Sequence, residues 1–342
     1  MTLDPGPGDP GHGPRPDVLD RVRSGAAEVA ERAVHVHVAT GRLAPYADEL
    51  VASGELDRVG RVEGADASGP WAVDHPDPEA AVALVLALDA VNFGSGWHPV
   101  VRKRPGCSGA VTMATNLREH VDRHGDVTAR WLAGIEPSDA HRIFDQPHDG
   151  GPVEELMAHF AAALAELGTL VETDHDGSFT ALVASAGGSA ARLVDVLASL
   201  PGFADVWTLD GVEVPILKRA QLAVADLHRT FGPTGPGRFR DLDRLTAFAD
   251  NLVPHVLRLD GVLVVDEAVV QRIDAEELLA AGSREELEIR AVGLHAVEEL
   301  RRALAARGHA VPSWQLDQVL WSRGAGARYK ARPRHRARST AY

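Results

Sequence analysis

Apolar residues recur at three- and four-residue intervals along most of the chain, the spacing that gathers them on one face of an α-helix. Ser189, Ser283 and Ser313 stand near the start of such stretches, where a hydroxyl can accept from a free first-turn amide. The stretches with helical spacing are residues 17–34, 46–54, 78–91, 153–171, 189–200 and 283–308.

Two short segments, residues 33–38 and 211–215, carry the alternating valines typical of strands. They are too few to build a large sheet. The pattern therefore predicts a mainly α protein with few short strands.

The pattern also sets the expected domain limits. Residues 1–16 contain so many prolines and glycines that they can bury little, and we expect a disordered leader. Residues 17–342 contain no repeat and no linker long enough to divide a core. We expect them to form a single α-helical domain.

Charge narrows the range of partners. The formal net charge of -14 disfavours a broad polynucleotide interface, which needs clustered Lys and Arg. Cys107 is the only cysteine, which fits a reducing compartment. No run approaches the ~20 apolar residues of a membrane helix, and the N-terminus lacks signal-peptide features. We expect a cytoplasmic protein with a small-molecule partner.

A glycine-rich, partly basic segment, "VNFGSGWHPVVRKRPGCSGA", spans residues 91–110. It lacks the spacing of a phosphate-binding P-loop, so a plain turn is one reading. The other reading is a nucleotide-binding wall, in which Phe93 and Trp97 supply π-faces and Asn92 a polar edge. In that case the cations at 102–104 either hold an anion or only orient the loop.

Lys218 raises a similar choice. It lies in "VPILKRAQLAVADLHRTF", residues 214–231, beside an apolar stripe at helical spacing. Such a lysine usually lays its stem on the core edge and keeps its ammonium in water. A role in a pocket is the alternative.

Asp250 is a more specific candidate for a functional residue than Lys218. The apolar positions in residues 241–254 predict a short helix that Pro254 ends, with Asp250 in its last turn. A carboxylate there faces the negative end of the helix dipole. It is either an exposed residue bonded to the next loop or a locally unfavourable acid retained for catalysis.

Two further features stay secondary. His35 and His37 share a strand face, but no third ligand is near, so the sequence indicates no metal site. The basic end of the chain, residues 323–342, is either a disordered tail or a segment that packs back onto the acidic body.

Motifs along the chain, taken together, resemble those of the queuosine salvage proteins, the queuosine 5′-phosphate N-glycosylase family. They occur in the family's order, from about residue 18 to the last residue. These motifs are "DAVNFGSGWHP", "SGAVTMATNL", "ILKRAQLAVADL", "DLDRLTAFADNLVP", "GSREELEIRAVGLHAVEEL", "LDQVLW" and "PRHRARSTAY".

The resemblance implies hydrolysis of queuosine 5′-monophosphate to queuine and ribose 5-phosphate, without a metal or other cofactor. It also implies a fold similar to helix-hairpin-helix DNA glycosylases. Breaking the glycosidic bond develops an oxocarbenium-like cation that a carboxylate can stabilise. The rival readings are a DNA base-excision glycosylase and a non-catalytic queuosine nucleotide-binding protein.

The same resemblance assigns roles to residues. Asp250 is expected to be the catalytic carboxylate, and Lys218 to hold the phosphate or ribose or to assist the leaving group. Asp317 is expected to accept from the base or its aminomethyl group. The remaining residues expected to bind the substrate are Asn92, Phe93, Trp97, Phe248 and His75.

Overall fold

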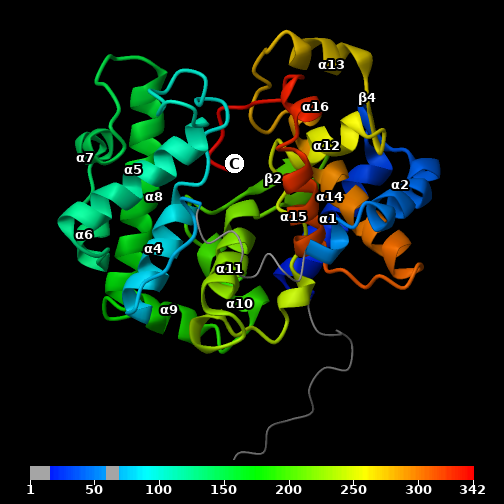
Figure 1. Cartoon of the computed structure of the whole chain (residues 1–342). Coiled ribbons are helices and arrows are strands. Elements are labelled where there is room, and N and C mark those ends of the chain that lie inside the picture. Colours follow the sequence, from blue (N-terminus) through cyan, green and yellow to red (C-terminus); the bar gives the residue numbers. More distant parts are fainter. Residues whose placement is uncertain (1–15, 59–68) are drawn as a thin grey trace, which may run out of the picture.

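The computed structural model describes residues 16–58 and 69–342, and helices make up most of it (Figure 1). Residues 1–15 of the predicted disordered leader lie outside the described residues. The helices are α1 (Val18–Arg32), α2 (Thr40–Ala52), α4 (Pro78–Ala90), α5 (Gly109–His124), α6 (Ala129–Ala133), α7 (Pro137–Ile143), α8 (Pro152–Asp174), α9 (Phe179–Ser185), α10 (Ala190–Ala198), α11 (Lys218–Phe231), α12 (Val253–Leu259), α13 (Glu267–Asp274), α14 (Arg284–Ala305), α15 (Ser313–Arg323) and α16 (Ala327–Lys330). Short 3-10 turns are η1 (Leu56–Arg58), η2 (Gly235–Gly237) and η3 (Leu242–Arg244).

The described strands form two small antiparallel pairs. Strand β1 (Val36–Val38) pairs with β4 (Leu263–Val265), with Val36 opposite Val265. Strand β2 (Val206–Leu209) pairs with β3 (Val212–Pro215) in a hairpin. The prediction of a mainly α protein with few short strands is confirmed. The likeness to helix-hairpin-helix DNA glycosylases stays a prediction.

Helix starts follow the predicted caps at two of three serines. The Ser189 and Ser283 hydroxyls accept from the N–H groups of Arg192 and Glu286. The prediction for Ser313 is wrong, because Pro312 takes the capping position and Ser313 is the first helical residue. Its hydroxyl is buried and has no hydrogen-bond partner among the described residues.

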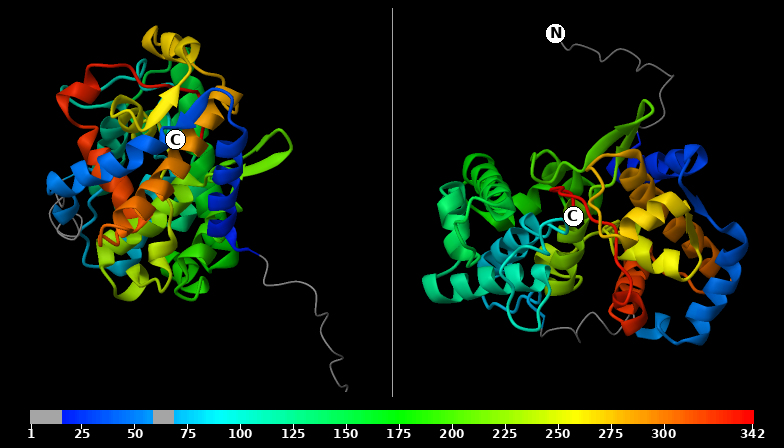
Figure 2. Two further views of the ribbon diagram at one scale, coloured as in Figure 1. Left: turned by 90° about the vertical axis from the view of Figure 1, so that its right-hand side faces the viewer. Right: turned by 90° about the horizontal axis from the view of Figure 1, so that it is seen from above.

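Helix α11 lies between two groups of helices. Figure 1 and Figure 2 show α4 to α9 on one side of it and α1, α2 and α12 to α16 on the other. Helix α4 is apolar around its whole circumference and is buried from Ala80 to Ala90, in contact with α8, α9 and α11. A helix that is apolar all round belongs in the core.

The basic end of the chain packs back onto the body, so the disordered alternative is wrong. From α16 it crosses to the helices on the other side (Figure 1). The N–H groups of Gly94 and Ser95 donate to the Tyr342 oxygen at 3.0 and 3.4 Å. A Cβ at Gly96 would lie 2.4 Å from the Ala337 carbonyl oxygen. Gly96 therefore makes room for the end of the chain.

Within residues 16–58 and 69–342, no single helix has the length and apolar composition needed to cross a membrane. The bent pair formed by α9 and α10 meets that test only when the two helices are taken together.

Candidate functional site

The "KRAQ" motif opens α11, and its lysine points into the protein. Leu217 adopts a left-handed conformation with φ of 54°, which turns the chain from strand β3 into the helix. Lys218 is 5% exposed, and its ammonium donates to the Asn92 carbonyl at 3.0 Å. The reading in which this ammonium stays in water is therefore wrong.

The two other polar residues of the motif hold the walls of the site. Arg219 donates to the Ala90 carbonyl, at the last turn of α4, with an N–O distance of 2.5 Å. Gln221 exchanges hydrogen bonds with Thr246, whose N–H donates to Gln221 Oε1 at 2.9 Å. Three residues in the first turn of α11 thus join the end of α4 to the segment 246–250.

The helix predicted over residues 241–254 is wrong. Only the short turn η3 forms, and the chain then runs without helix to α12, in which Pro254 lies in the first turn. Proline is tolerated there because the N–H that it lacks would have no partner in the helix. Asp250 therefore precedes a helix. Its carboxylate accepts from the N–H groups of Leu252 and Val253 at 2.6 and 3.3 Å.

Side chains from three other elements hold the segment 246–250, "TAFAD". Besides the Gln221 contacts, Arg290 of α14 donates to the Ala249 carbonyl at 3.0 Å. Asp317 of α15 accepts from the Phe248 N–H at 2.9 Å. The segment is therefore held in place by "KRAQ", "EIRA" and "LDQVLW", which are far apart in the sequence. Asp250 sits at its end, half-buried.

The charges of the site act on one another. Burial, followed by the neighbouring Asp250 carboxylate, raises the pKa of Asp317 to about 8. Burial lowers the pKa of Lys218, and the Asp250 and Asp89 carboxylates oppose that shift. Lys218, Asp250 and Asp317 therefore share one site.

Asp89 belongs to this site and was missed by the sequence analysis. It is 1% exposed in the last turn of α4, and neither carboxylate oxygen has a hydrogen bond of ordinary geometry among the described residues. Burial and the neighbouring Asp226 raise its pKa, while Lys218 and the Asn92 side chain oppose the shift. The signal in the sequence was a single acidic residue, Asp89, within the otherwise apolar residues 80–91.

Arg334 was missed for a different reason. It comes from the C-terminal segment and is half-buried beside Asp250, whose carboxylate opposes the effect of burial in lowering the pKa of Arg334. Only the packing of the tail brings it there. It adds a cation to the Asp250 side of the site.

The segment 91–98 forms a wall of this site. Asn92 contributes the carbonyl that receives Lys218. Phe93 is buried, with the Arg219 guanidinium 4.6 Å from its ring centroid and the centroid of the Phe160 ring 4.9 Å away in a T-shaped arrangement. Trp97 is also buried, and its indole N–H donates to Glu155 at 2.9 Å. These contacts make Phe93 and Trp97 part of the packing of the wall.

Two of the three cations that follow the wall pair with acidic residues outside the site. Arg104 forms a two-point ion pair with Glu119, both contacts at 2.6 Å. Arg102 pairs with Asp145 at 3.1 Å. These contacts favour the reading in which the basic run orients its loop.

His75 does not join the other predicted residues. It lies before the N-terminus of α4, with its ring 3.5 Å from Asp126, and lines a cavity of about 280 Å³. Asn92 follows the other end of α4, a helix of 13 residues. At 1.5 Å per residue the two are separated by about 20 Å of helix.

The fold and site define a class: a mainly α protein in which a buried lysine and several carboxylates meet beside an irregular segment. The comparison with known families gives the particular one. A family model described as "Queuosine salvage protein" matches residues 73–342, and the chain belongs to this family.

Curated proteins of similar sequence support the same family. A protein of Sphaerobacter thermophilus is 40% identical over 271 residues, which cover 77% of this chain and 82% of that protein. A mouse protein is 28% identical over 284 residues, with the same two coverages, and a Dictyostelium discoideum protein is 34% identical over 181 residues, 52% of this chain and 56% of that protein. Each is named "Queuosine 5'-phosphate N-glycosylase/hydrolase".

Proposed function

We propose that this protein hydrolyses the N-glycosidic bond of queuosine 5′-monophosphate and releases queuine and ribose 5-phosphate. The observation that carries the proposal is that the Asp250 carboxylate acts electrostatically on both Lys218 and Asp317, inside a chain of the queuosine salvage family. The names of the curated relatives support the same substrate.

We propose that Asp250 acts on the ribose of the substrate. As the C1′–N bond breaks, its electron pair leaves with the base and positive charge develops on the sugar. The Asp250 carboxylate stabilises that charge and accepts a proton from the attacking water, whose oxygen bonds to C1′. The backbone N–H groups of Leu252 and Val253 hold the carboxylate in position.

We assign Asp317 to the leaving base as a proton donor, in place of the accepting role expected from the sequence. A 7-deazaguanine lacks N7, the usual protonation site of a purine, so its departure needs another donor. A carboxyl group with a pKa of about 8 carries a proton at neutral pH. Phe248, whose N–H donates to Asp317, is the aromatic residue that we propose for stacking on the base.

We propose that Arg334 binds the 5′-phosphate. We propose that Lys218 contacts the ribose and offsets the negative charge of the neighbouring carboxylates. A guanidinium matches the oxygens of a phosphate at two points. Lys218 is buried and bonded to the Asn92 carbonyl, so it suits a fixed position near the reacting bond. We further propose that the reaction takes place in the cytoplasm and involves no polynucleotide.

Incubation of the purified protein with queuosine 5′-monophosphate, followed by chromatography, tests the proposal. Release of queuine supports it. Tight binding without release would favour a non-catalytic nucleotide-binding protein. Release of a base from duplex DNA, weakening with added salt, would favour a DNA base-excision glycosylase. The net charge of -14 speaks against that last outcome.

A further inference from the structure

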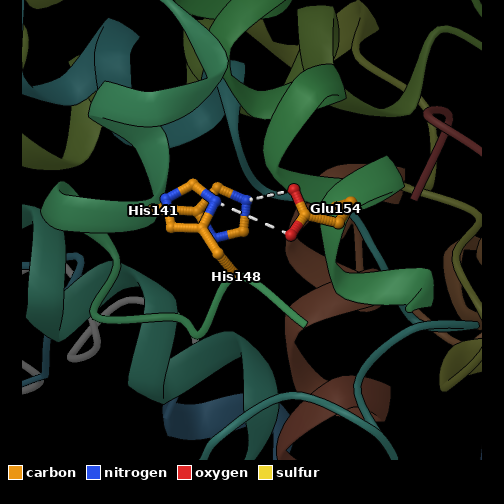
Figure 3. A group of neighbouring side chains, drawn as sticks. All are labelled: His141, His148 and Glu154. Carbon is orange, nitrogen blue, oxygen red and sulfur yellow. Dashed lines mark hydrogen bonds and ion pairs between the residues drawn. The ribbon is translucent and has the colours of Figure 1, made fainter. Parts of the chain in front are cut away.

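Outside the site described above, two histidines and a glutamate converge on one point. His141 lies in α7 and Glu154 in the first turn of α8, while His148 comes from the loop between them. Figure 3 shows both imidazole rings beside the Glu154 carboxylate. One possible ligand atom from each residue lies within 4.8 Å of the others.

The contacts of the cluster are short. His141 Nε2 is 2.9 Å from one Glu154 oxygen, and His148 Nδ1 is 3.6 Å from the other. The two imidazole rings stack with centroids 3.6 Å apart. Three donors bound to one zinc ion at about 2.1 Å lie about 3.4 Å apart in a tetrahedron. The three ligand atoms lie within 4.8 Å of one another, so the side chains would rotate to close on the ion.

The hydrogen-bonding capacity of His141 does not match its surroundings. Its Nδ1 faces the Gln146 carbonyl oxygen at 3.2 Å and its Nε2 faces the Glu154 carboxylate. Both neighbours are acceptors, but a neutral imidazole has only one N–H. One of the two contacts therefore lacks a hydrogen, and a cation bound between Nε2 and the carboxylate would satisfy both groups.

We propose that His141, His148 and Glu154 bind one zinc-like divalent ion, with water completing the coordination. Two imidazoles and a carboxylate suit zinc, whereas magnesium and calcium prefer sites built of oxygen. The Nδ1–H of His141 donates to the Gln146 carbonyl, which leaves Nε2 free to bind the ion. This metal site lies outside the proposed catalytic site and takes no part in the reaction. It differs from the prediction, made from the sequence, that the chain binds no metal.

Such an ion would brace the wall formed by the glycine-rich segment. Gln146, whose carbonyl holds His141, also bonds through its side chain to the Arg102 backbone N–H at 2.8 Å and to the Arg102 carbonyl at 3.0 Å. Glu155, the residue after Glu154, accepts from the Trp97 indole. The bound ion would therefore fix both segments that support residues 97–102, and its role is structural.

Zinc titration of the full-length chain, without an affinity tag and after removal of metals by a chelator, tests the proposal. We expect one equivalent of Zn²⁺ to bind with a Kd below about 1 μM. Cobalt(II) substitution should give the visible absorption of a tetrahedral site. Saturating zinc should raise the Tm by about 2 °C or more.

Two variants and one control locate the ion. His148→Ala and Glu154→Gln should each weaken zinc binding at least about tenfold and abolish the increase in Tm. The His148 side chain is 59% exposed, so its removal leaves no cavity, and circular dichroism checks the fold. Glu172→Gln, at an exposed glutamate of the same helix, should bind zinc as the unmodified chain does.

Absence of stoichiometric zinc binding by the unmodified chain would overturn the proposal. So would equal affinity in His148→Ala, Glu154→Gln and the unmodified chain, because the ion would then bind elsewhere. Neither result bears on queuine release, so failure here is distinguishable from failure of the proposed enzyme activity.

Discussion

Arg290 holds Asp205 through two contacts of 3.0 and 2.6 Å, and both side chains are shielded from solvent. The same guanidinium donates to the carbonyl of Ala249, the residue before Asp250. Asp205 also accepts from the Lys218 backbone N–H at 3.3 Å. One buried ion pair thus joins the segment that ends at Asp250 to the start of α11, where Lys218 lies.

Removing the arginine should destabilise the fold strongly. Arg290→Met leaves Asp205 buried without its cation, and we expect a loss of about 3 to 5 kcal/mol in the free energy of unfolding. Denaturation by guanidinium chloride measures it. Arg302→Met on the same helix is the control, because the Arg302 side chain is 62% exposed and pairs with Glu299 at the surface. That variant should lose less than about 1 kcal/mol. Equal losses in the two variants would contradict the account.

Asp317→Asn should separate activity from stability. The amide keeps an oxygen for the Phe248 N–H, but it cannot transfer a proton to the base, so we expect kcat to fall about 100-fold or more. In the unmodified enzyme, kcat/KM should decline as the pH rises through about 8, where Asp317 loses its proton. A profile that stays flat from pH 7 to 9 would remove Asp317 from the role of acid.

The same variant has a defined effect on stability. The folded pKa of about 8 lies above the unfolded value of about 3.9, so Asp317 is protonated in both states below pH 4. Stability is lost as the pH rises from there to about 8, because only the unfolded state ionises freely. Asp317→Asn should remove that loss. We expect it to gain about 4 kcal/mol relative to the unmodified chain between pH 5 and pH 8. Denaturation curves at the two pH values measure the difference.

Arg334→Ala and Lys218→Ala should differ in how they treat the phosphate. Loss of a phosphate contact should lower kcat/KM for queuosine 5′-monophosphate at least about tenfold more than for the nucleoside. We expect that selectivity for Arg334→Ala. Lys218→Ala should lower both about 100-fold, since it acts near the reacting bond.

The matched control for the phosphate contact is Arg332→Ala, two residues from Arg334 and paired with Asp274 at the surface. It should leave both substrates unaffected. A selective loss of the nucleotide in Lys218→Ala, with none in Arg334→Ala, would exchange the two assignments.

Gly96→Ala tests whether the end of the chain must pack against the glycine-rich segment. The added methyl group would lie 2.4 Å from the Ala337 carbonyl oxygen, so the tail must shift. We expect a loss of about 1 to 3 kcal/mol and lower activity, because Arg334 moves with the tail. Gly41→Ala is the control, since its methyl group would meet nothing within 4 Å. Thermal unfolding and queuine release that are unchanged in Gly96→Ala would show that the contact is dispensable.

The sequence predicted much of the fold, because helices and caps are encoded locally. The apolar run of α4 and the serines before α10 and α14 are examples. The prediction that Pro254 ends a helix was wrong because it used only this local pattern. A proline marks a helix boundary, but tertiary contacts keep residues 245–250 out of a helix, so a helix begins at this boundary instead.

The site was only partly accessible from the sequence. The family motifs pointed to Lys218, Asp250 and Asp317, whose electrostatic effects on one another place them together. Nothing local distinguishes Arg334 from its neighbours in a basic tail, and its approach to Asp250 depends on how that tail packs. The burial of Phe93 and Trp97 is likewise a tertiary result, which spacing along the chain does not encode.

The most direct test of the central claim compares Asp250→Asn with the unmodified enzyme in the queuine release assay. The amide oxygen can still accept from Leu252 and Val253, so the fold should be kept while the charge is lost. We predict a decrease in kcat of about 1,000-fold with an unchanged Tm, and full activity in the exposed control Asp243→Asn. Queuine release by Asp250→Asn at the rate of the unmodified enzyme would contradict the assignment of Asp250 as the catalytic carboxylate.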